Sequence, residues 1–408
     1  MSKKSIAFLI ISLVIGCLFV LRACHFGSID SGYQKLNEVQ PFHYNGKQFA
    51  GSQSCIPCHE SIYKTHTATA HFNTSARANG ENLQGSFNGE QDRINLVGSQ
   101  VKLVAESEDY FQVTKSYPGK ILDKSKIDVV IGSGVKGQSH LTFKGDSLYQ
   151  LQVSYFKLTN GWVNSPGFPN QRFQRPVMDN CIKCHVTFAK NEDVSGMSNV
   201  YDKDSFIYGV DCERCHGPSQ EHVDFRKGNS KLNTADPIVQ IDTLSRNLRD
   251  NICAQCHAGL RGNQLKNPFS YVVGEKLEEY SKNYNTRKPE YELDVHGNQY
   301  GLLKSSACYK NSPTMSCTTC HDSHLNQREQ ENVFNGKCME CHKAVQHPHE
   351  TEMKSSIAQY DNCIKCHMPV FPSKTMNVSL PNTNQEKAID IRTHLIGIYI
   401  DKVYQTKP

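Results

Sequence analysis

The chemistry that stands out in this chain is a five-residue pattern, Cys-x-x-Cys-His, which occurs seven times. Two thiols three positions apart on one helical turn can each add to a vinyl group of the same porphyrin, and the adjoining imidazole is then placed to bind the iron as its proximal ligand. Paired Cys-x-x-Cys knuckles also bind zinc, but a zinc site needs no histidine directly after the second cysteine. Because all seven pairs have one, the pattern predicts seven covalently bound haems c. The motifs, one to seven in chain order, are Cys55, Cys58 and His59; Cys181, Cys184 and His185; Cys212, Cys215 and His216; Cys253, Cys256 and His257; Cys317, Cys320 and His321; Cys338, Cys341 and His342; and Cys363, Cys366 and His367.

Each motif histidine fills one axial position of an iron, and a second histidine is the expected ligand on the opposite face. The chain has 18 histidines, so eleven lie outside the motifs. His25 and His43 belong to the N-terminal region and are expected to be solvated. The remaining nine form seven local groups, and seven groups for seven irons predict mostly bis-histidine haems. The distal candidates are His71 (with His66 beside it), His222, His324 and His394, followed by His140, His296 and His347 (with His349 beside it).

The composition indicates a fold built around these haems. Only 38% of the 408 residues are hydrophobic, which is low for a globular core, and porphyrin faces would supply much of the missing apolar interior. Short helices and long irregular connections are therefore expected in place of a layered fold. We predict a mainly α, haem-packed multihaem cytochrome c with much irregular structure and a small antiparallel β subdomain near the N-terminus. The apoprotein should be largely unfolded, because bonds to the cofactor are part of the folding free energy.

Two kinds of periodicity place elements along the chain. A helix is expected over 60–70, and another begins with Asp242 as N-cap and leads through apolar residues at four-residue spacing into motif four. Between about 85 and 156 the pattern changes to alternating or continuous apolar runs separated by Gly, Asp and Pro, which is typical of strands at hairpin spacing. We expect this sheet to be a scaffold or cover for the haems and not a separate binding module. The strand runs are 101–104, 110–113, 127–131, 140–143 and 148–156.

The N-terminus directs the chain outward. A short positive segment precedes an apolar run over 6–21, which is typical of a signal peptide or a signal anchor. The stretch that ends at Cys17 resembles a bacterial lipobox, which would leave a lipid on Cys17; Cys24 is a poorer lipidation site. The alternatives are an uncleaved helical anchor and full release of the chain. All three place the body outside the cytoplasm, where haem c is attached. The expected parts are 1–24, a signal, lipoprotein or membrane anchor; 25–50, a linker; 51–175, the first haem motif with the β-rich subdomain; and 176–408, a six-haem cytochrome core.

The formal charge of +5 and the pI of about 8.3 do not indicate nucleic-acid binding. Loss of the N-terminal segment removes three positive charges, and each haem adds two propionates against about one positive charge of a ferric centre. The assembled, oxidised protein is therefore expected to carry net negative charge. The lysines and arginines are better assigned to propionate contacts and solvated surface.

Several stretches carry a resemblance to a known family: 58–71, 209–222, 317–324, 366–369 and 392–394. With them the chain resembles the cytochrome c-552/4 family, typified by the tetrahaem cytochrome that receives electrons from hydroxylamine oxidoreductase, and the likeness extends from Gly51 to about Tyr399. In such proteins the histidine that ends the first helix, the one after Cys-His-Gly-Pro and the one in Cys-His-x-x-His are similar to distal ligands. The resemblance thus implies that role for His71, His222 and His324, and by the same analogy for His394.

The chain also departs from the tetrahaem pattern, because it has seven motifs and a strand-rich insertion. Haem-to-haem geometry and substrate are therefore not carried over. The segment 294–301, Asp-Val-His-Gly-Asn-Gln-Tyr-Gly, looks like a stretch of related chains from environmental bacteria.

Two functions of different classes fit these residues. The first is an electron-transfer protein, located in the periplasm or at the surface of a bacterial cell and tethered to the membrane, that passes electrons from a membrane-linked donor to a redox acceptor, which can be another cytochrome. The alternative is a haem enzyme for a small nitrogen or sulfur oxyanion, which needs one iron with an open distal face. Some multihaem reductases replace the motif histidine with lysine at the catalytic haem, and no such variant occurs here. We favour electron transfer and predict no catalytic residue.

Overall fold

The computed structural model describes residues 39–228, 236–259, 263–282, 293–343, 362–380 and 385–399. All of them belong to one compact unit, Leu36–Pro408, whereas the other unit, Met1–Lys35, lies outside the described residues together with Cys17, Cys24 and His25. The expectations for an N-terminal anchor therefore stay predictions, as do the domain boundaries. Within the described ranges, no helix combines the length and the apolar character that crossing a bilayer requires.

The prediction of a mainly α fold is wrong. About 28% of the described residues lie in helices and about 29% in strands, which form several antiparallel sheets. The helices are short, as expected, because most of them span little more than a haem motif or the turns before it. Strands are more abundant than predicted because two further hairpins follow motifs two and seven, in the stretch 176–408 that was assigned from the sequence to the six-haem cytochrome core.

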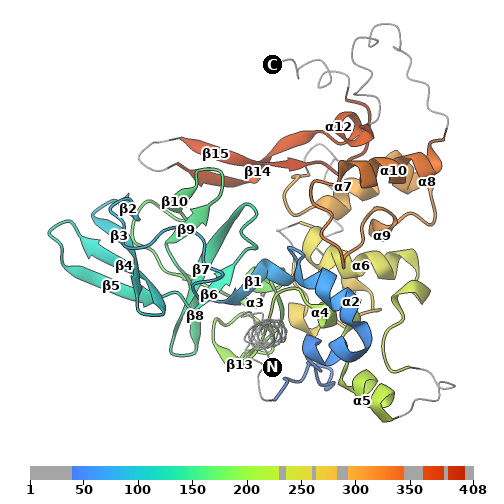
Figure 1. The fold of residues 1–408 in the computed structure, drawn as a ribbon, viewed down its shortest axis with the longest axis horizontal. Coiled ribbons are helices and arrows are strands. Elements are labelled where there is room, and N and C mark those ends of the chain that lie inside the picture. Colours follow the sequence, from blue (N-terminus) through green and yellow to red (C-terminus); the bar gives the residue numbers. More distant parts are fainter. Residues whose placement is uncertain are drawn as a thin grey trace, which may run out of the picture. The chain divides into compact units, whose positions relative to one another are not determined.

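The β region after motif one contains two antiparallel sheets (Figure 1). One is a four-stranded meander in the order β2-β3-β4-β5, and the other has the order β1-β6-β7-β8-β11, with β9 paired to β7 and β10 paired to β9. Each of the five strand runs predicted from the sequence overlaps a strand. The strands are β1 Ser75–Arg77, β2 Arg93–Leu96, β3 Ser99–Glu106, β4 Asp109–Ser116, β5 Ile121–Lys126, β6 Val129–Ile131, β7 Gly137–Lys144, β8 Ser147–Gln150, β9 Val153–Phe156, β10 Gly161–Asn164 and β11 Arg175–Pro176.

Alternation along β3 buries one face of the meander. Val101 and Leu103 point into a core that they share with Val153 of β9 and Trp162 of β10. Burial of four such side chains stabilises the two sheets by several kcal/mol, at about 1.5–3 kcal/mol for each fully buried apolar side chain. The β region therefore has an apolar core of its own and does not depend on porphyrin faces for it.

A third hairpin directly follows motif two. It pairs β12 (Val186–Asn191) with β13 (Tyr201–Tyr208), and β12 begins at the residue after His185. Phe188 and Tyr201 of this hairpin pack in a core that also contains Phe49, which precedes motif one, and Phe269. The hairpin thus joins the chain segments around motifs one, two and four.

A fourth hairpin follows motif seven. It pairs β14 (Val370–Ser379) with β15 (Glu386–Arg392), and its register is irregular between Pro372 and Asn377. Its far end packs on the β region (Figure 1, red against green). There Val378 and Ile389 meet Phe156 of β9 and Val163 of β10.

The helices carry the motifs. Motif three forms a single turn that starts at Asp211, whose side chain accepts a hydrogen bond from the Cys212 N–H at 2.7 Å. Motif four ends the helix predicted before it, but that helix begins after Ser245, and Asp242 lies in a separate 3-10 turn. The helices are η1 Ser52–Cys55, α2 Ile56–Thr67, η2 Phe72–Thr74, α3 Asp179–Ile182, α4 Cys212–His216, α5 Gln220–Gly228, η3 Ile241–Thr243, α6 Arg246–His257, η4 Pro268–Ser270, η5 Leu277–Glu279, α7 Gln299–Ser305, α8 Ala307–Asn311, α9 Cys317–Cys320, α10 Glu331–Cys341 and α12 Cys363–His367.

Candidate haem-binding sites

Thiols of different motifs lie close to one another. Four pairs of thiols influence each other's pKa, and they join motif one to three, two to four, four to five and six to seven: Cys55 with Cys212, Cys184 with Cys256, Cys253 with Cys317, and Cys338 with Cys363. Cys215 of motif three also lies close to Cys253 and Cys256, and Cys320 of motif five lies close to Cys341 of motif six. The fold therefore connects the motifs in the order one, three, four, five, six, seven, with motif two attached beside motif four.

In three pairs of imidazoles, the ring centres are separated by nearly the same distance. The ring centres of His216 and His324 are 6.2 Å apart with 14° between the ring planes, and those of His321 and His394 are 6.1 Å apart with 28°. His71 and His257 are also 6.1 Å apart, with 76° between the planes. Each pair combines a motif histidine with a distal candidate predicted from the sequence.

This width fits one iron. An imidazole nitrogen binds a first-row metal at about 2.0 Å, and the ring centre lies roughly 1.1 Å behind that nitrogen, so two rings on opposite sides of one metal have centres about 6 Å apart. Two imidazoles in van der Waals contact face to face would lie closer together than that. The residues present therefore fit a haem iron between the rings of each pair.

One imidazole of each pair is held in the neutral form that binds metals. Burial lowers the pKa of His71, of His216 and of His394 to about 4 in each case, with smaller contributions from neighbouring histidines. An imidazole with a pKa near 4 is uncharged at neutral pH, and the neutral ring is the metal ligand.

Hydrogen bonds to Nδ1 orient three motif histidines. Nδ1 of His185 lies 2.8 Å from Thr74 Oγ1, that of His257 lies 3.2 Å from Gln299 Oε1, and that of His367 lies 2.8 Å from the Gly397 carbonyl. A partner on Nδ1 fixes the tautomer and turns Nε2 toward the metal. The chain thus supplies the outer support that metal-binding histidines need.

Two further distal candidates, His296 and His222, lie near motif histidines but are not among the pairs with ring centres about 6 Å apart. His296 is close enough to His185 of motif two to lower the pKa of its imidazole. His222 and His59 both act on His216 in the same way. Nδ1 of His222 contacts the Asp236 carboxylate at 2.5 Å, and Arg226 donates to the other oxygen of that carboxylate at 2.7 Å, so the ring is held in one orientation.

The structure places the remaining histidines differently. His140 is fully buried in the β region, with Nδ1 bonded to the Val153 carbonyl at 3.2 Å and its ring 5.8 Å from the Trp162 ring, and it faces no motif. His43 is 6% exposed and packs against Phe49 and Phe188, so the expectation that it is solvated is wrong. His347 and His349 lie outside the described residues.

His66 is a buried residue that was grouped with His71 as a distal candidate and has no separate predicted role. Its ring centre lies 6.2 Å from that of His324, and its Nε2 is 3.8 Å from the Asp211 carboxylate. His66 lies on α2, most of whose residues are exposed. Its position in the sequence therefore did not indicate that its side chain is buried. Its contacts make it a neighbour of the His216 and His324 pair.

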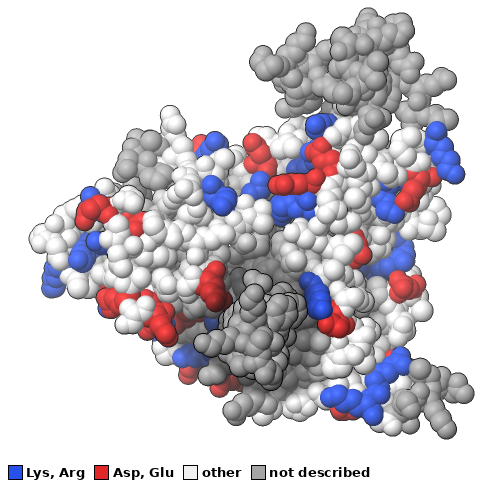
Figure 2. Space-filling model, in the orientation of Figure 1, with Lys and Arg blue, Asp and Glu red and all other residues white. Residues whose placement is uncertain are grey.

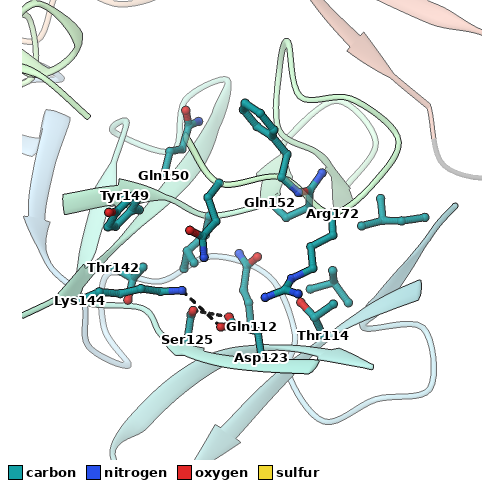
Figure 3. A pocket seen from close by; sticks show the side chains of 15 residues that line it. Gln112, Thr114, Asp123, Ser125, Thr142, Lys144, Tyr149, Gln150, Gln152 and Arg172 are labelled. Atoms are coloured by element: carbon teal, nitrogen blue, oxygen red, sulfur yellow. Dashed lines mark hydrogen bonds and ion pairs between the residues drawn. The ribbon is translucent and has the colours of Figure 1, made fainter. Parts of the chain in front are cut away.

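A polar pocket in the β region has no connection to the motifs. Figure 3 shows it between β4, β5, β7 and β8, with Arg172 at one side. Lys144 and Ser125 both bind Asp123 there, at 3.3 and 2.6 Å. No motif residue lines it. On the face drawn in Figure 2, basic and acidic side chains are interspersed and neither sign covers a continuous area.

Comparisons with known proteins support a multihaem c-type cytochrome. A family model described as cytochrome c554 and c-prime matches residues 169–217, which contain motifs two and three. The multiheme cytochrome MtrA of Shewanella baltica (strain OS185) is 24% identical over 199 residues, which are 46% of this chain and 52% of that protein. The chain thus spans about half the length of this curated relative.

The fold is also similar to that of a solved structure, the outer cell wall cytochrome OcwA. The TM-score is 0.51 at 18% sequence identity, over 85% of this chain and 79% of the solved chain.

Proposed function

We propose that this chain, a multihaem c-type cytochrome, carries seven covalent haems c, one at each motif, and transfers electrons between redox partners outside the cytoplasm. The observation that carries the proposal is the set of three imidazole pairs with ring centres 6.1–6.2 Å apart. When bound, haem would supply reversible one-electron chemistry. Two axial imidazoles on one iron leave no position for a substrate, which favours electron transfer over catalysis.

The contacts of the imidazoles support an assignment of distal ligands to individual motifs. The imidazole pairs support His71 as the distal ligand for motif four, His324 for motif three and His394 for motif five. The effect of His296 on the His185 imidazole supports His296 for motif two. We assign His222 to motif one, since His222 and His59 both act on His216. His140 has contacts that favour a structural role in the β core, and His347 remains the candidate for motif six.

The contacts between cysteines support a continuous route for electrons. Cysteines of successive motifs lie near one another from motif one through three, four, five and six to seven. Because each cysteine would be bonded to the edge of a macrocycle, neighbouring haems would lie within a short distance of one another. The protein's part is to fix these distances and to keep both axial ligands in place during oxidation and reduction.

Location and partners follow from the N-terminus and from the relatives. The segment 6–21 and Cys17 support export with a lipid or helical anchor, and the solved relative is named as an outer cell wall cytochrome. A periplasmic or cell-surface position suits a membrane-linked donor and an acceptor that is itself a redox protein, including other cytochromes.

Two measurements on the intact chain, produced in a host that matures cytochromes c, test the proposal. Pyridine haemochrome analysis with intact mass should give seven haems per chain, and electron paramagnetic resonance of the oxidised protein should show predominantly low-spin iron. A high-spin haem that binds cyanide, nitrite or hydroxylamine would favour the enzyme alternative. A colourless product, or zinc in the cysteine pairs, would refute haem binding.

A further inference from the structure

One end of the four-stranded meander brings together two turns and a connecting segment. The strand register aligns them: Ser99 pairs with Leu96 on one side and with Ser116 on the other, so the β2–β3 turn and the β4–β5 turn lie next to each other. The β3–β4 turn lies at the opposite end. The segment that leads to β11 joins the first end, because Val97 in the β2–β3 turn forms a bridge with Gln171. We call the segments 96–99, 115–122 and 170–175 the turn patch.

The turn patch exposes large apolar side chains that neither the haem sites nor the core of the β region uses. The Tyr117 hydroxyl donates to the Leu96 carbonyl at 2.7 Å, which ties the two turns together and keeps the ring in one place. Several large apolar side chains exposed side by side mark an interaction site on a soluble domain. The exposed fractions are 71% for Val97, 61% for Tyr117, 57% for Ile121, 46% for Phe173 and 39% for Leu122.

The charged side chains of the turn patch are all positive: Lys115, Lys120, Arg172 and Arg175. In the part of the chain that the structure describes, no carboxylate pairs with any of them. The first acidic residue after the patch, Asp123, is paired with Lys144 at 3.3 Å. Arg172 lies at one side of the polar pocket (Figure 3) and is exposed. The patch therefore carries positive charge that the protein itself does not neutralise.

The opposite end of the same meander has the contrary arrangement. Lys124 pairs with Glu106 and Lys126 pairs with Asp109, each at 2.6 Å, beside the β3–β4 turn. One end of a single sheet thus neutralises its lysines, whereas the other leaves them unpaired among exposed apolar side chains. This difference within one sheet provides a matched control region.

An anionic bilayer fits this combination of side chains. The apolar side chains stand on turns at the end of a sheet and not on a flat sheet face, so they can enter the headgroup region by about 5–10 Å while the neighbouring cations stay level with the lipid phosphates. A tyrosine ring such as that of Tyr117 suits this depth, because one end is apolar and the other polar. The core of a protein interface is depleted in lysine, and Lys120 lies between Tyr117 and Ile121, which argues against a second protein as occupant.

We propose that the turn patch docks the folded body of the protein onto an anionic phospholipid bilayer. The inference goes beyond the proposed function, because it gives the body a membrane contact separate from the N-terminal segment and independent of the haem ligands. The apolar side chains of the two turns insert, and the four cations bind the lipid phosphates.

The test is hydrogen–deuterium exchange, followed by mass spectrometry, on the full-length holoprotein reconstituted in vesicles. One set of vesicles contains phosphatidylcholine alone and the other also contains phosphatidylglycerol. Peptides that cover 96–99 and 115–122 should exchange at least about tenfold more slowly on the anionic vesicles, since each cation near an anionic surface favours the docked state about fivefold. Peptides that cover the β3–β4 turn should exchange equally on both. High salt should abolish the slowing, because it screens the attraction.

Substitutions at the two ends of the meander separate the patch from the overall charge. Lys115→Gln combined with Lys120→Gln should reduce the ratio of docked to undocked protein about 25-fold, at about fivefold for each lysine. Val97→Ser combined with Ile121→Ser keeps every charge and should reduce the ratio about tenfold, because apolar surface no longer leaves water. The matched control, Lys124→Gln combined with Lys126→Gln, makes the same change of charge at the opposite end and should leave the slowing as in the wild type. The haem count and far-ultraviolet circular dichroism show that each variant has folded.

Several results would overturn the proposal. Equal exchange on both kinds of vesicle excludes an anionic bilayer as the occupant, whether the exchange is slow or fast. Slowing without vesicles that grows with protein concentration identifies a second copy of the chain instead. A control variant that loses as much slowing as the Lys115 and Lys120 variant shows that only net charge matters. The comparison of lipids and of salt uses the unaltered protein, so it decides the question even where a variant fails to fold, and none of these results changes the haem count or the spin states that test electron transfer.

Discussion

Tyr309 offers a sharp test of how the fold joins motif four to motif five. Its hydroxyl donates to Asp250 Oδ2 at 2.8 Å, and the N–H of Cys317, the first residue of motif five, donates to Asp250 Oδ1 at 3.1 Å. Asp250 stands on α6, three residues before Cys253, and both Asp250 and Tyr309 are at most 2% exposed. Burial, together with the carboxylate, raises the pKa of the Tyr309 hydroxyl, so it remains a donor.

Removal of this hydroxyl should cost stability without a change of shape. A hydrogen bond to a charged acceptor contributes about 1.5–3 kcal/mol, and phenylalanine keeps the ring that packs under the Arg246 guanidinium, 4.4 Å from the ring centre. We expect Tyr309→Phe to lower the free energy of unfolding by about 2 kcal/mol. Asp250→Ala should cost about 4 kcal/mol, because it leaves a buried hydroxyl and a buried N–H without an acceptor, at about 1–3 kcal/mol each, in addition to the lost bonds.

The assay is guanidinium-induced unfolding of the oxidised holoprotein, followed at the Soret band and by far-ultraviolet circular dichroism. In the Asp250→Ala background, the second change Tyr309→Phe should recover about 1–3 kcal/mol, because it removes the buried hydroxyl that has lost its acceptor. The double-mutant cycle then gives a coupling energy of about 3–5 kcal/mol. Tyr117→Phe is the matched control, because the Tyr117 hydroxyl binds the Leu96 carbonyl at 2.7 Å from a side chain that is 61% exposed. A cost for Tyr309→Phe no larger than that of the control would refute the reasoning.

Three further predictions concern ligands, attachment and pH. His394→Ala should turn one of the seven haems high-spin in electron paramagnetic resonance and leave the haem count unchanged, because the His321 iron would lose the partner that now lies across the 6.1 Å gap; an unchanged low-spin spectrum would contradict the pairing. Replacing Cys363 and Cys366 together by alanine should lower the intact mass by one haem, whereas loss of none would show that motif seven is not an attachment site. Burial raises the pKa of Glu213 to about 7 from its usual 4.5, so the protonated side chain stabilises the fold fully below about pH 4.5, and this contribution of about 3 kcal/mol disappears as the pH rises through 7. The difference in unfolding free energy between wild type and Glu213→Gln, which cannot titrate, should fall by that amount between these pH values, and a difference independent of pH would exclude the shift.

The haem motifs could be predicted from the sequence because their chemistry is local. Five consecutive residues contain the two thiols and the proximal ligand. The β-rich stretch after motif one could likewise be predicted, because apolar and polar residues alternate along its strands. Distal ligands are harder, since His71 and His257 or His321 and His394 are far apart in the chain and meet only in the fold. The residue type identified the candidates. Only tertiary packing shows that His394 lies opposite a motif histidine whereas His140 lies in the β core.

The errors have physical reasons as well. The C-terminal hairpin contains Pro372, which argues against a strand in the middle of a sheet but is tolerated in a two-stranded ribbon with an interrupted register. Asp242 is of a residue type common at N-caps, yet Ser245, three residues later, occupies the N-cap position of α6. His43 was expected in solvent because its neighbours in sequence are polar, whereas its neighbours in space are Phe49 and Phe188.

The contact between Cys55 and Cys212 bears on the order in which the protein assembles. Motif one touches motif three, not motif two, and the whole β region lies between them in the chain. Ser75, at the start of that region, donates to the His185 carbonyl at 2.6 Å and accepts from the Gly209 N–H at 2.9 Å. Closing so long a loop is slow for an unstructured chain but fast once local strand pairing has shortened it. The sheets would thus form before motif one meets motif three. A haem attached at motif one would reach the haem of motif three only after the β region has folded.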